Sequence, residues 1–283
     1  MVKESHTRYL HQANWTQELR EYIFGKIGLN KASRVLEVGC GTGAILSQIN
    51  FPVVGLDLNL SALKEAWVHL QTNLPSPTEK LGFFSENKAP LQIFRQNPKK
   101  KSHQQKKNRV SPPLTCGDAL SLPYANSSFD VLFSHFLLLW LPNPQKAIEE
   151  MKRVTVAKGD IIFFAEPDYS QRVDKPAELA QLGKWQADAL KARGANPYIG
   201  ADLAEICYET GIKIIETGTL QKSTREASAE ERANEWDTLQ TDLRGRVPNS
   251  TIRKMKKIDA EAWARGERIL DIPTYYLWGK NQV

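Results

Sequence analysis

The sequence lacks the long apolar runs that a membrane-spanning segment requires. Its longest strongly apolar stretch is residues 136–141, whereas a helix needs about 20 apolar residues to cross a bilayer. The first residues contain no apolar run followed by a small-residue cleavage site, so we expect no secretory signal peptide. These absences predict a cytoplasmic protein.

Cysteine is also scarce, with only Cys40, Cys116 and Cys207 in 283 residues. An odd count argues against a disulfide framework, and the wide spacing is not that of metal ligands, so we expect no metal site. The composition, 41% hydrophobic and 25% charged, is typical of a folded globular protein.

The formal net charge of +6 is concentrated in one segment, residues 74–113. Only Glu79 and Glu86 oppose its nine basic residues, so the rest of the chain is close to neutral. A polar, like-charged run without hydrophobic periodicity cannot bury enough apolar surface to fold, and we predict a largely disordered surface insert. The basic residues are Lys80, Lys88, Arg95, Lys99, Lys100, Lys101, Lys106, Lys107 and Arg109.

Outside the insert, short β-branched runs alternate with helical patterns. This alternation predicts an α/β fold in which a mostly parallel sheet carries helices on both faces. The last strand follows a helical stretch, and we expect it to insert antiparallel. The seven strands are expected at residues 34–38, 53–57, 114–118, 129–134, 160–166, 212–220 and 273–280.

Helices are expected in the segments between these strands. Ser61 is a candidate N-cap for the second helix, and Gly159 is expected to close the third. The region 176–207 reads as mostly helical with a break at residues 194–200. The other helices are expected at residues 42–50, 61–74, 143–156, 227–244 and 251–268.

The most informative stretch is VLEVGCGTG at residues 35–43, where a buried strand ends in alternate glycines. Such glycines let backbone N–H groups approach a ligand at the carboxyl edge of a sheet. With Ala44 the loop also satisfies the dinucleotide pattern G-x-G-x-x-G/A, so a nicotinamide enzyme competes with other interpretations. Glu37 argues against it, because a carboxylate there suits an ammonium-bearing ligand and would repel a pyrophosphate. Asp57, at the end of the second strand, could bind a ribose diol in either case.

Four motifs together resemble the class I S-adenosylmethionine-dependent methyltransferases, most closely the ubiquinone/menaquinone-biosynthesis type of small-molecule enzyme. They are VLEVGCGTG, GLDLN, GDALSLPYANSSFDVLFSHFLLLWL and GDIIFFAEPD, and they cover roughly residues 34–168 apart from the insert. The resemblance implies a Rossmann-like seven-stranded sheet and S-adenosyl-L-methionine as cofactor, with S-adenosyl-L-homocysteine as product. It also implies methyl transfer to a small organic acceptor.

The resemblance assigns cofactor roles by position. The glycine loop and Glu37 would surround the methionine part, and the second and third strand ends would bind the ribose and adenine. Ser134 and His135 would lie under the methionine, and an N-terminal helix would close over the cofactor. The implied residues are Tyr9, Trp15, Glu37, Gly39, Cys40, Gly41, Gly43, Asp57, Leu58, Asp118, Ala119, Ser134 and His135.

Methyl transfer from a sulfonium is an in-line displacement on an activated carbon, so alignment supplies much of the catalysis. A base is needed only where the acceptor must lose a proton. The candidate catalytic residues at the carboxyl edge are His135, Glu166, Asp168 and Tyr169. Each has a structural alternative; the two carboxylates, for example, could cap the segment that follows them.

We expect one methyltransferase domain spanning residues 1–283. Within it, residues 1–30 would form a helical cap, residues 74–113 the basic insert, and residues 168–210 a helical lid over the acceptor. By analogy with the fold, Trp185 and Tyr198 in this lid favour a bulky organic or lipid-like acceptor.

Two other functions stay open. The basic run at residues 99–109 could bind RNA, an anionic surface or a partner by neutralising phosphates. Residues 133–136, however, lack the [DN]-P-P-[YF] signature of amino-methylating DNA enzymes, and the chain has no Pro-Cys dipeptide for cytosine C5 methylation. A non-catalytic S-adenosylmethionine-binding or assembly protein is the second alternative, because no residue is indispensable to every methyl transfer.

Overall fold

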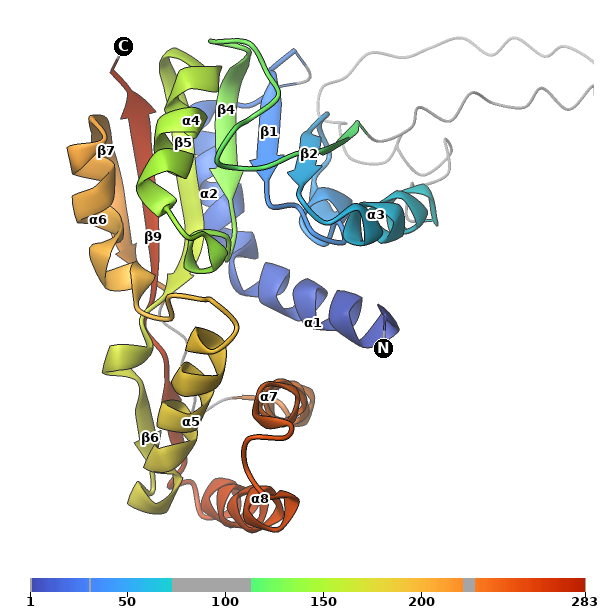
Figure 1. Cartoon of the computed structure of the whole chain (residues 1–283), viewed down its shortest axis with the longest axis vertical. Coiled ribbons are helices and arrows are strands. Elements are labelled where there is room, and N and C mark those ends of the chain that lie inside the picture. Colours follow the sequence, from blue (N-terminus) through green and yellow to red (C-terminus); the bar gives the residue numbers. More distant parts are fainter. Residues whose placement is uncertain (1, 31, 73–112, 221–226, 283) are drawn as a thin grey trace, which may run out of the picture.

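The computed structural model describes residues 2–30, 32–72, 113–220 and 227–282. Seven strands form its central sheet: β1 (Val35–Val38), β2 (Val54–Asp57), β3 (Leu114–Cys116), β4 (Phe129–Ser134), β5 (Thr155–Pro167), β7 (Ile212–Thr219) and β9 (Thr274–Asn281). Their order is β3-β2-β1-β4-β5-β9-β7. The first five are mutually parallel, and β9 runs antiparallel between β5 and β7. The predicted sheet, with its antiparallel last strand, is confirmed (Figure 1).

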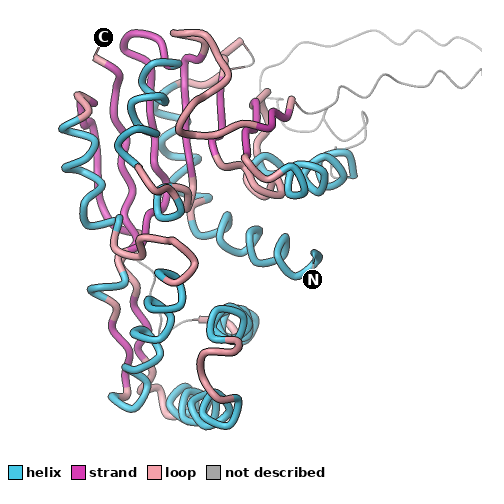
Figure 2. Tube along the Cα trace, in the orientation of Figure 1, coloured by secondary structure: helices cyan, strands magenta, loops and turns pink. Residues whose placement is uncertain are grey.

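The helices lie on both faces of this sheet and beyond the edge where its parallel strands end (Figure 2). Their arrangement follows the predicted alternation of strand and helix. They are α1 (Val2–Trp15), α2 (Gln17–Ile27), α3 (Leu60–Thr72), α4 (Pro144–Val154), α5 (Ala180–Lys191), α6 (Ile199–Glu209), α7 (Ala229–Leu243) and α8 (Asn249–Ala264).

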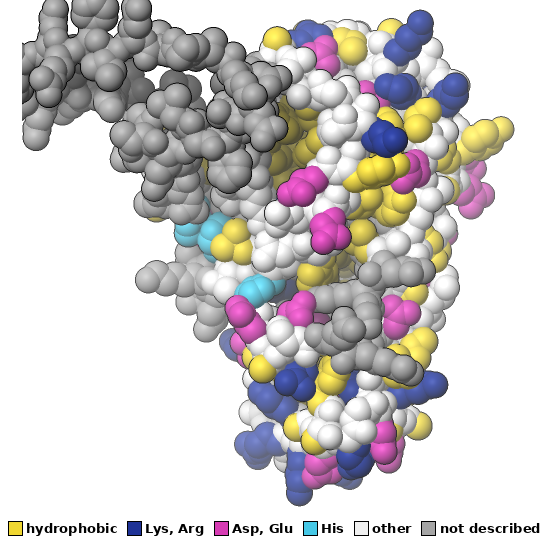
Figure 3. Space-filling view, turned by 180° about the vertical axis from the view of Figure 1, so that it is seen from behind, with side chains coloured by type: hydrophobic (Ala, Val, Ile, Leu, Met, Phe, Trp, Pro, Cys, Tyr) yellow, Lys and Arg dark blue, Asp and Glu magenta, His cyan; other side chains and the backbone are white. Residues whose placement is uncertain are grey.

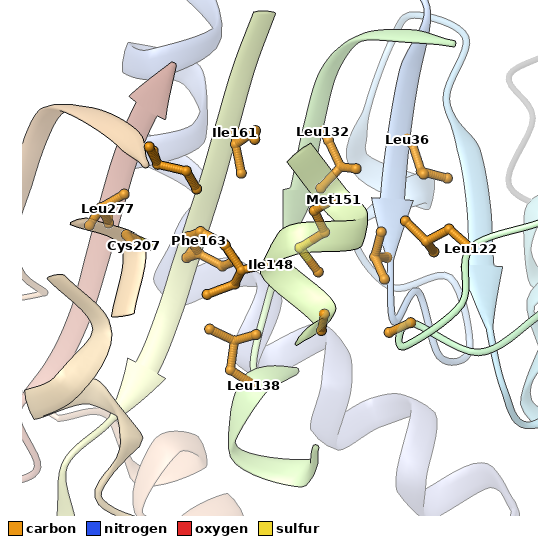
Figure 4. Close-up of a cluster of buried hydrophobic side chains, with 14 of the residues drawn as sticks. Leu36, Leu122, Leu132, Leu138, Ile148, Met151, Ile161, Phe163, Cys207 and Leu277 are labelled. Carbon is orange, nitrogen blue, oxygen red and sulfur yellow. The ribbon is translucent and has the colours of Figure 1, made fainter. Parts of the chain in front are cut away.

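One face of the sheet packs against α4 and α6. Ile148 and Met151 of α4 are fully buried and point toward Leu132 of β4 and Phe163 of β5 (Figure 4). The spacing of three residues places both side chains on one side of the helix. Each such buried side chain contributes about 1.5–3 kcal/mol to folding.

The opposite face packs against α2 and α3. Phe24 of α2 contacts Phe133 of β4 and Phe164 of β5, with ring centroids 5.6 and 5.5 Å apart. Offset and edge-on aromatic pairs at these separations add stabilisation to the area that they bury. This contact fixes α2, and with it the N-terminal residues, against the centre of the sheet.

A second, smaller unit lies beyond the carboxyl edge of the parallel strands (Figure 1). Strands β6 (Val173–Lys175) and β8 (Ile269–Asp271) pair antiparallel there, and α5 packs against α7. Their shared apolar cluster contains Leu182, Leu239 and Ile252, with Trp185 at its margin. Of the predicted lid at residues 168–210, the part up to α5 belongs to this unit together with the segment from α7 to β8, whereas α6 packs against the central sheet.

Three local predictions were wrong. Residues 42–50 form turns and a short 3-10 helix, Leu46–Gln48, because Gly41 and Gly43 take left-handed conformations that delay helix formation. The start of α3 is capped by Asn59, whose side chain accepts the N–H of Ser61 at 2.9 Å. Gly159 lies inside β5 and does not close α4, which ends at Val154.

The predicted insert, residues 74–113, lies outside the described residues apart from Pro113, and its disorder stays a prediction. In the part of the chain that the structure describes, no helix is long and apolar enough to cross a membrane. The predicted N-terminal helical segment is present as α1 and α2.

Candidate functional site

The glycine loop joins β1 to the 3-10 helix at the carboxyl edge of the sheet. Gly39, Gly41 and Gly43 all have positive φ, at 78°, 52° and 76°. A Cβ at Gly39 would lie 2.7 Å from Cδ1 of Leu137, whereas a Cβ at Gly41 would approach a ring carbon of Tyr9 at 4.0 Å. Gly39 is therefore required by packing, and Gly41 leaves room between the loop and α1.

Asp57, at the end of β2, holds this loop. Its Oδ2 accepts the Gly41 N–H at 2.8 Å, and its Oδ1 accepts the N–H of Asn59 at 2.8 Å. The neighbouring Leu58 is 69% exposed, so its side chain is free to contact a planar ring. The arrangement presents a carboxylate and an apolar side chain side by side at the edge of the sheet.

Glu37 is buried in β1, and its Oε2 has no hydrogen-bond partner among the residues that the structure describes. Burial raises the pKa of Glu37 to about 8, against the opposing influence of the Arg20 guanidinium. Arg20 is itself buried in α2, where it donates to the Ala13 carbonyl at 2.6 Å and to Thr16 and Gln48. The Glu37 Oε2 is therefore a buried acceptor atom, without a hydrogen bond from the described residues, at the start of the glycine loop.

Helix α1 covers the loop. His6 is buried, stacks on His69 of α3 at 3.5 Å between ring centroids, and has its Nδ1 2.7 Å from Oγ1 of Thr42. Trp15, at the other end of α1, meets the ring of Phe136 edge-on at 6.2 Å. The structure therefore brings the predicted Tyr9 and Trp15 to the site on one helix.

Three other predicted cofactor residues differ in what they offer. Asp118 is half-buried, and its Oδ1 accepts the Leu120 N–H at 2.9 Å. Ala119 is buried in the core beneath it. The Cys40 thiol is directed into the core, where it would meet a Cβ added to Gly55 at 2.9 Å, and burial raises its pKa. The Cys40 side chain therefore offers no group to a ligand at the loop.

Ser134 ends β4 beside the end of β1, and His135 follows it. The Ser134 Oγ and the His135 Nε2 are buried without a hydrogen-bond partner in the described part of the chain. Burial, and secondarily the charge of Arg20, lowers the pKa of His135 to about 3, so the imidazole is neutral at physiological pH. Val38 pairs with Ser134 in the sheet, so the Ser134 side chain lies on the sheet face opposite to Glu37, whereas His135 and Glu37 both lie within reach of the Arg20 charge.

The remaining predicted catalytic residues follow β5. Glu166 is fully buried and accepts the N–H groups of Leu137, Leu138 and Leu139 at 3.1, 2.9 and 3.2 Å. Burial raises its pKa to about 7. Its carboxylate caps the short 3-10 helix Leu138–Trp140, which precedes it in the chain, and not the segment that follows it as the structural alternative supposed.

Asp168 is also fully buried and accepts from Ser170 and Gln171 at 2.6 to 2.8 Å. It caps the short 3-10 helix Tyr169–Gln171. The Tyr169 ring faces the second unit, and burial raises the pKa of its phenol while the nearby Arg172 opposes that rise. Among the predicted catalytic residues, Tyr169 is therefore the one that lies beside the charged side chains of this unit.

Arg20, His6 and Thr42 were not predicted from the sequence. A buried arginine or histidine in an amphipathic helix gives no pattern in a single sequence, because polar residues normally mark the exposed face. Thr42 lies within the glycine motif, and its position there was a usable signal. Among the described residues, no cluster of His, Cys, Asp and Glu could hold a metal ion.

The site fits S-adenosylmethionine on three observations. Glu37 offers a buried acceptor for an ammonium group, Asp57 a carboxylate for ribose hydroxyls, and Gly41 an open cradle under Tyr9. The same set would be a poor pyrophosphate site, because Glu37 and Asp57 bring acidic groups to the loop.

Comparison with known proteins agrees with this geometry. The family model described as a methyltransferase domain matches residues 7–217. An uncharacterized methyltransferase of Schizosaccharomyces pombe is 25% identical over 252 residues, 84% of this chain and 79% of that protein. A demethylmenaquinone methyltransferase of Renibacterium salmoninarum is 26% identical over 159 residues, which is 54% of this chain and about half (51%) of the relative.

Solved structures share the fold. A candidate methyltransferase of Bacillus halodurans aligns with a TM-score of 0.56 at 13% identity, covering 90% of this chain and 95% of that one. Phosphoethanolamine N-methyltransferase 2 of Haemonchus contortus, solved with S-adenosylhomocysteine, aligns with a TM-score of 0.53 at 15% identity, covering 94% and 53%. The chain belongs to the methyltransferase domain family and is an S-adenosylmethionine-dependent methyltransferase.

Proposed function

We propose that this chain binds S-adenosylmethionine between the glycine loop and α1 and transfers its methyl group to a small organic acceptor. The observation that carries the proposal is the buried Oε2 of Glu37, which has no hydrogen-bond partner within the described ranges. A buried acceptor without a partner costs free energy, and an ammonium-bearing ligand would relieve that cost. Asp57 and Leu58 would bind the ribose and the adenine face.

The bound cofactor supplies a methyl group already activated by its sulfonium. The protein's part is then to align the two reactants and to exclude water. In this role α1 covers the loop through His6 and reaches Phe136 through Trp15, while Ser134 Oγ and His135 Nε2 would offer polar atoms near the methionine end. Arg20 acts on Glu37 as a positioning residue.

The acidic and basic groups of the site favour an acceptor that needs no strong base. His135, with a pKa near 3, takes up a proton poorly, and the raised pKa of Tyr169 keeps its phenol protonated. Glu166 and Asp168 are occupied by backbone and side-chain donors. An acceptor atom with an available lone pair, such as a neutral amine, fits these conditions.

A radiolabel experiment tests the acceptor class. The enzyme would be incubated with methyl-labelled S-adenosylmethionine and, separately, with the low-molecular-mass fraction of a cell extract and with total RNA. Label in the small-molecule fraction is expected. Label in RNA that is lost when residues 76–112 are deleted would instead support the nucleic-acid alternative. Cofactor binding without label in either fraction would support a non-catalytic binding protein.

A further inference from the structure

Three side chains of the two contacting helices α1 and α7 each carry a buried polar atom without a partner among the described residues. They are Arg8, Asn234 and Glu235, whose Nε, Nδ2 and Oε1 find no hydrogen bond in the described part of the molecule. Buried polar atoms are satisfied in the great majority of cases, so three exceptions on two contacting helices call for a ligand or a function. Two of these atoms are donors, and the third is an acceptor.

The surrounding charges do not explain the exceptions, because they are paired with one another. Arg172 binds Asp174 at 2.7 Å, and Arg193 binds Asp242 at 2.8 Å. Arg268 also binds Asp174, at 2.7 Å. Among the described residues, this network leaves one basic and one acidic side chain without a close ion-pair partner or a full set of hydrogen-bond partners.

Arg8 and Glu235 are those two groups. The nearest carboxylate contact of Arg8 is Asp242, at the long distance of 4.0 Å, and Asp242 is already bound by Arg193 and Gln186. Glu235 is surrounded by the charges of Arg172, Asp174, Arg268 and Arg8 without a hydrogen bond to its Oε1 from any described residue. A guanidinium and a carboxyl group, the latter with its pKa raised by burial, are therefore incompletely hydrogen-bonded where α1 contacts α7.

The position of this group matches that of an acceptor. Arg8 precedes Tyr9, which lies over Gly41 of the glycine loop. Tyr169 follows β5. It lies close enough to Arg172, Glu235, Asp242 and Arg8 for their charges to influence the pKa of its phenol. Helix α1 lies between the carboxyl edge of the sheet and α7 (Figure 1), and it contacts α7.

The second unit is polar on its surface as well. Lys and Arg side chains mingle with Asp and Glu at the end of the molecule that carries it (Figure 3). The aromatic residues predicted to line the lid are used elsewhere: Trp185 joins the apolar cluster within the unit, and Tyr198 stacks under the Lys191 ammonium at 4.3 Å. The structure gives no apolar surface from these two rings to a lipid-like acceptor.

We propose that Arg8, Asn234 and Glu235 bind the methyl acceptor, and that this acceptor is a small polar metabolite carrying both an anionic group and an amine or hydroxyl. The Arg8 guanidinium and the Asn234 amide would donate to the anionic group, a carboxylate or phosphate. Glu235 would accept from the amine or hydroxyl. This inference rests on the proposed function, since it places the acceptor beside the same cofactor site.

A matched set of probes tests the inference. β-Alanine carries a carboxylate and an ammonium, propionate only the carboxylate, and β-alaninamide only the ammonium; inorganic phosphate serves as a second anion. Their binding to the protein loaded with S-adenosylhomocysteine would be measured by ligand-observed NMR. We expect β-alanine to bind more tightly than either single-group probe, and phosphate to compete with propionate.

The variants Arg8→Gln and Glu235→Gln separate the two contacts. Arg8→Gln should weaken propionate and phosphate by about tenfold or more, and Glu235→Gln should weaken β-alanine while leaving propionate unchanged. Arg244→Gln, at an exposed arginine that ends the same α7, is the control and should leave every affinity unchanged. Neither test variant should lower Tm, because the Arg8 Nε and the Glu235 Oε1 make no hydrogen bond in the described structure.

Two results would overturn the inference. One is that no anionic probe binds, or that both variants bind all the probes as the wild type does. The other is that Tm falls in both variants, which would show that Arg8 and Glu235 serve the fold. Binding of S-adenosylhomocysteine, measured in parallel, keeps the proposals apart: a protein that binds it and rejects the anionic probes contradicts only this inference, and a protein that does not bind it contradicts the proposed function.

Discussion

The Gly41 backbone N–H donates a 2.8 Å hydrogen bond to Oδ2 of Asp57, which joins the glycine loop after β1 to the end of β2. The two features that suggested a nucleoside-bearing cofactor are therefore one physical unit. The carboxylate fixes the loop in its left-handed conformation and presents its remaining acceptor capacity at the edge of the sheet.

Two glycine substitutions should separate the fold from the cofactor site. Gly41→Ala forces alanine into a left-handed conformation, at a cost of about 1–2 kcal/mol, and puts a methyl group into the space under Tyr9. It should reduce S-adenosylhomocysteine affinity more than stability. Gly39→Ala, whose Cβ would clash with Leu137 at 2.7 Å, should chiefly reduce stability. Calorimetry and urea unfolding would measure both, and equal losses in the two variants would contradict this division.

Cofactor affinity should rise with pH through about 8. The pKa of Glu37 is about 8 in the free protein, so the carboxyl is mostly protonated at neutral pH. An ammonium group favours the ionised form, so binding below that pKa releases a proton, and affinity should increase up to about tenfold per pH unit until the pKa is passed. Calorimetry in buffers of different ionisation enthalpy would count the proton. Glu37→Gln should bind weakly and without this pH dependence; an unchanged dependence in that variant would assign the proton to another group.

Glu166 is expected to matter for stability. Glu166→Ala would leave the N–H groups of Leu137, Leu138 and Leu139 buried without their acceptor, at a cost of about 3 kcal/mol or more. Glu149→Ala, at an exposed position of α4, should change stability by less than about 0.5 kcal/mol. Urea unfolding would compare the two. A stable Glu166→Ala protein with lost turnover would instead make Glu166 a catalytic residue.

Helix α1 should detach as the pH falls. Burial and the neighbouring His69 lower the pKa of His6 below its usual 6.5, so the docked state binds the proton less readily than the open state. The stabilisation from docking is therefore present above 6.5 and lost as the pH falls through the lowered pKa of His6. Hydrogen exchange of α1 amides should be faster at about pH 5 than at about pH 8. His69→Gln should reduce the difference, and equal exchange at both pH values would refute the role of the histidine pair.

Most of the sheet could be predicted because buried parallel strands leave short β-branched runs between glycines and polar turns. The glycine loop, Glu37 and Asp57 could be located for the same reason, since each sits where a strand ends. Residues 42–50 could not, because the helical pattern of their side chains is overridden by the glycines before them. The prediction that Gly159 ends the helix was wrong because β5 begins directly after α4.

The acceptor side was less predictable. Pairing of β6 with β8 joins residues almost a hundred positions apart, and single-sequence periodicity does not report contacts of that range. The contact between α1 and α7 is also long-range, so Asn234 and Glu235 could not be associated with the site from the sequence. The sequence shows that Trp185 is an aromatic residue of the predicted lid, but it does not show that the ring packs inside the unit.

The most direct test of the account is calorimetric titration of the full-length chain with S-adenosylhomocysteine, for the wild type and for Asp57→Ala. The wild type should bind at one site, and Asp57→Ala should bind about tenfold more weakly or worse, because it loses the ribose contact and the hydrogen bond that holds Gly41. Absence of binding by the wild type, or equal affinity in the two proteins, would contradict the cofactor site described above.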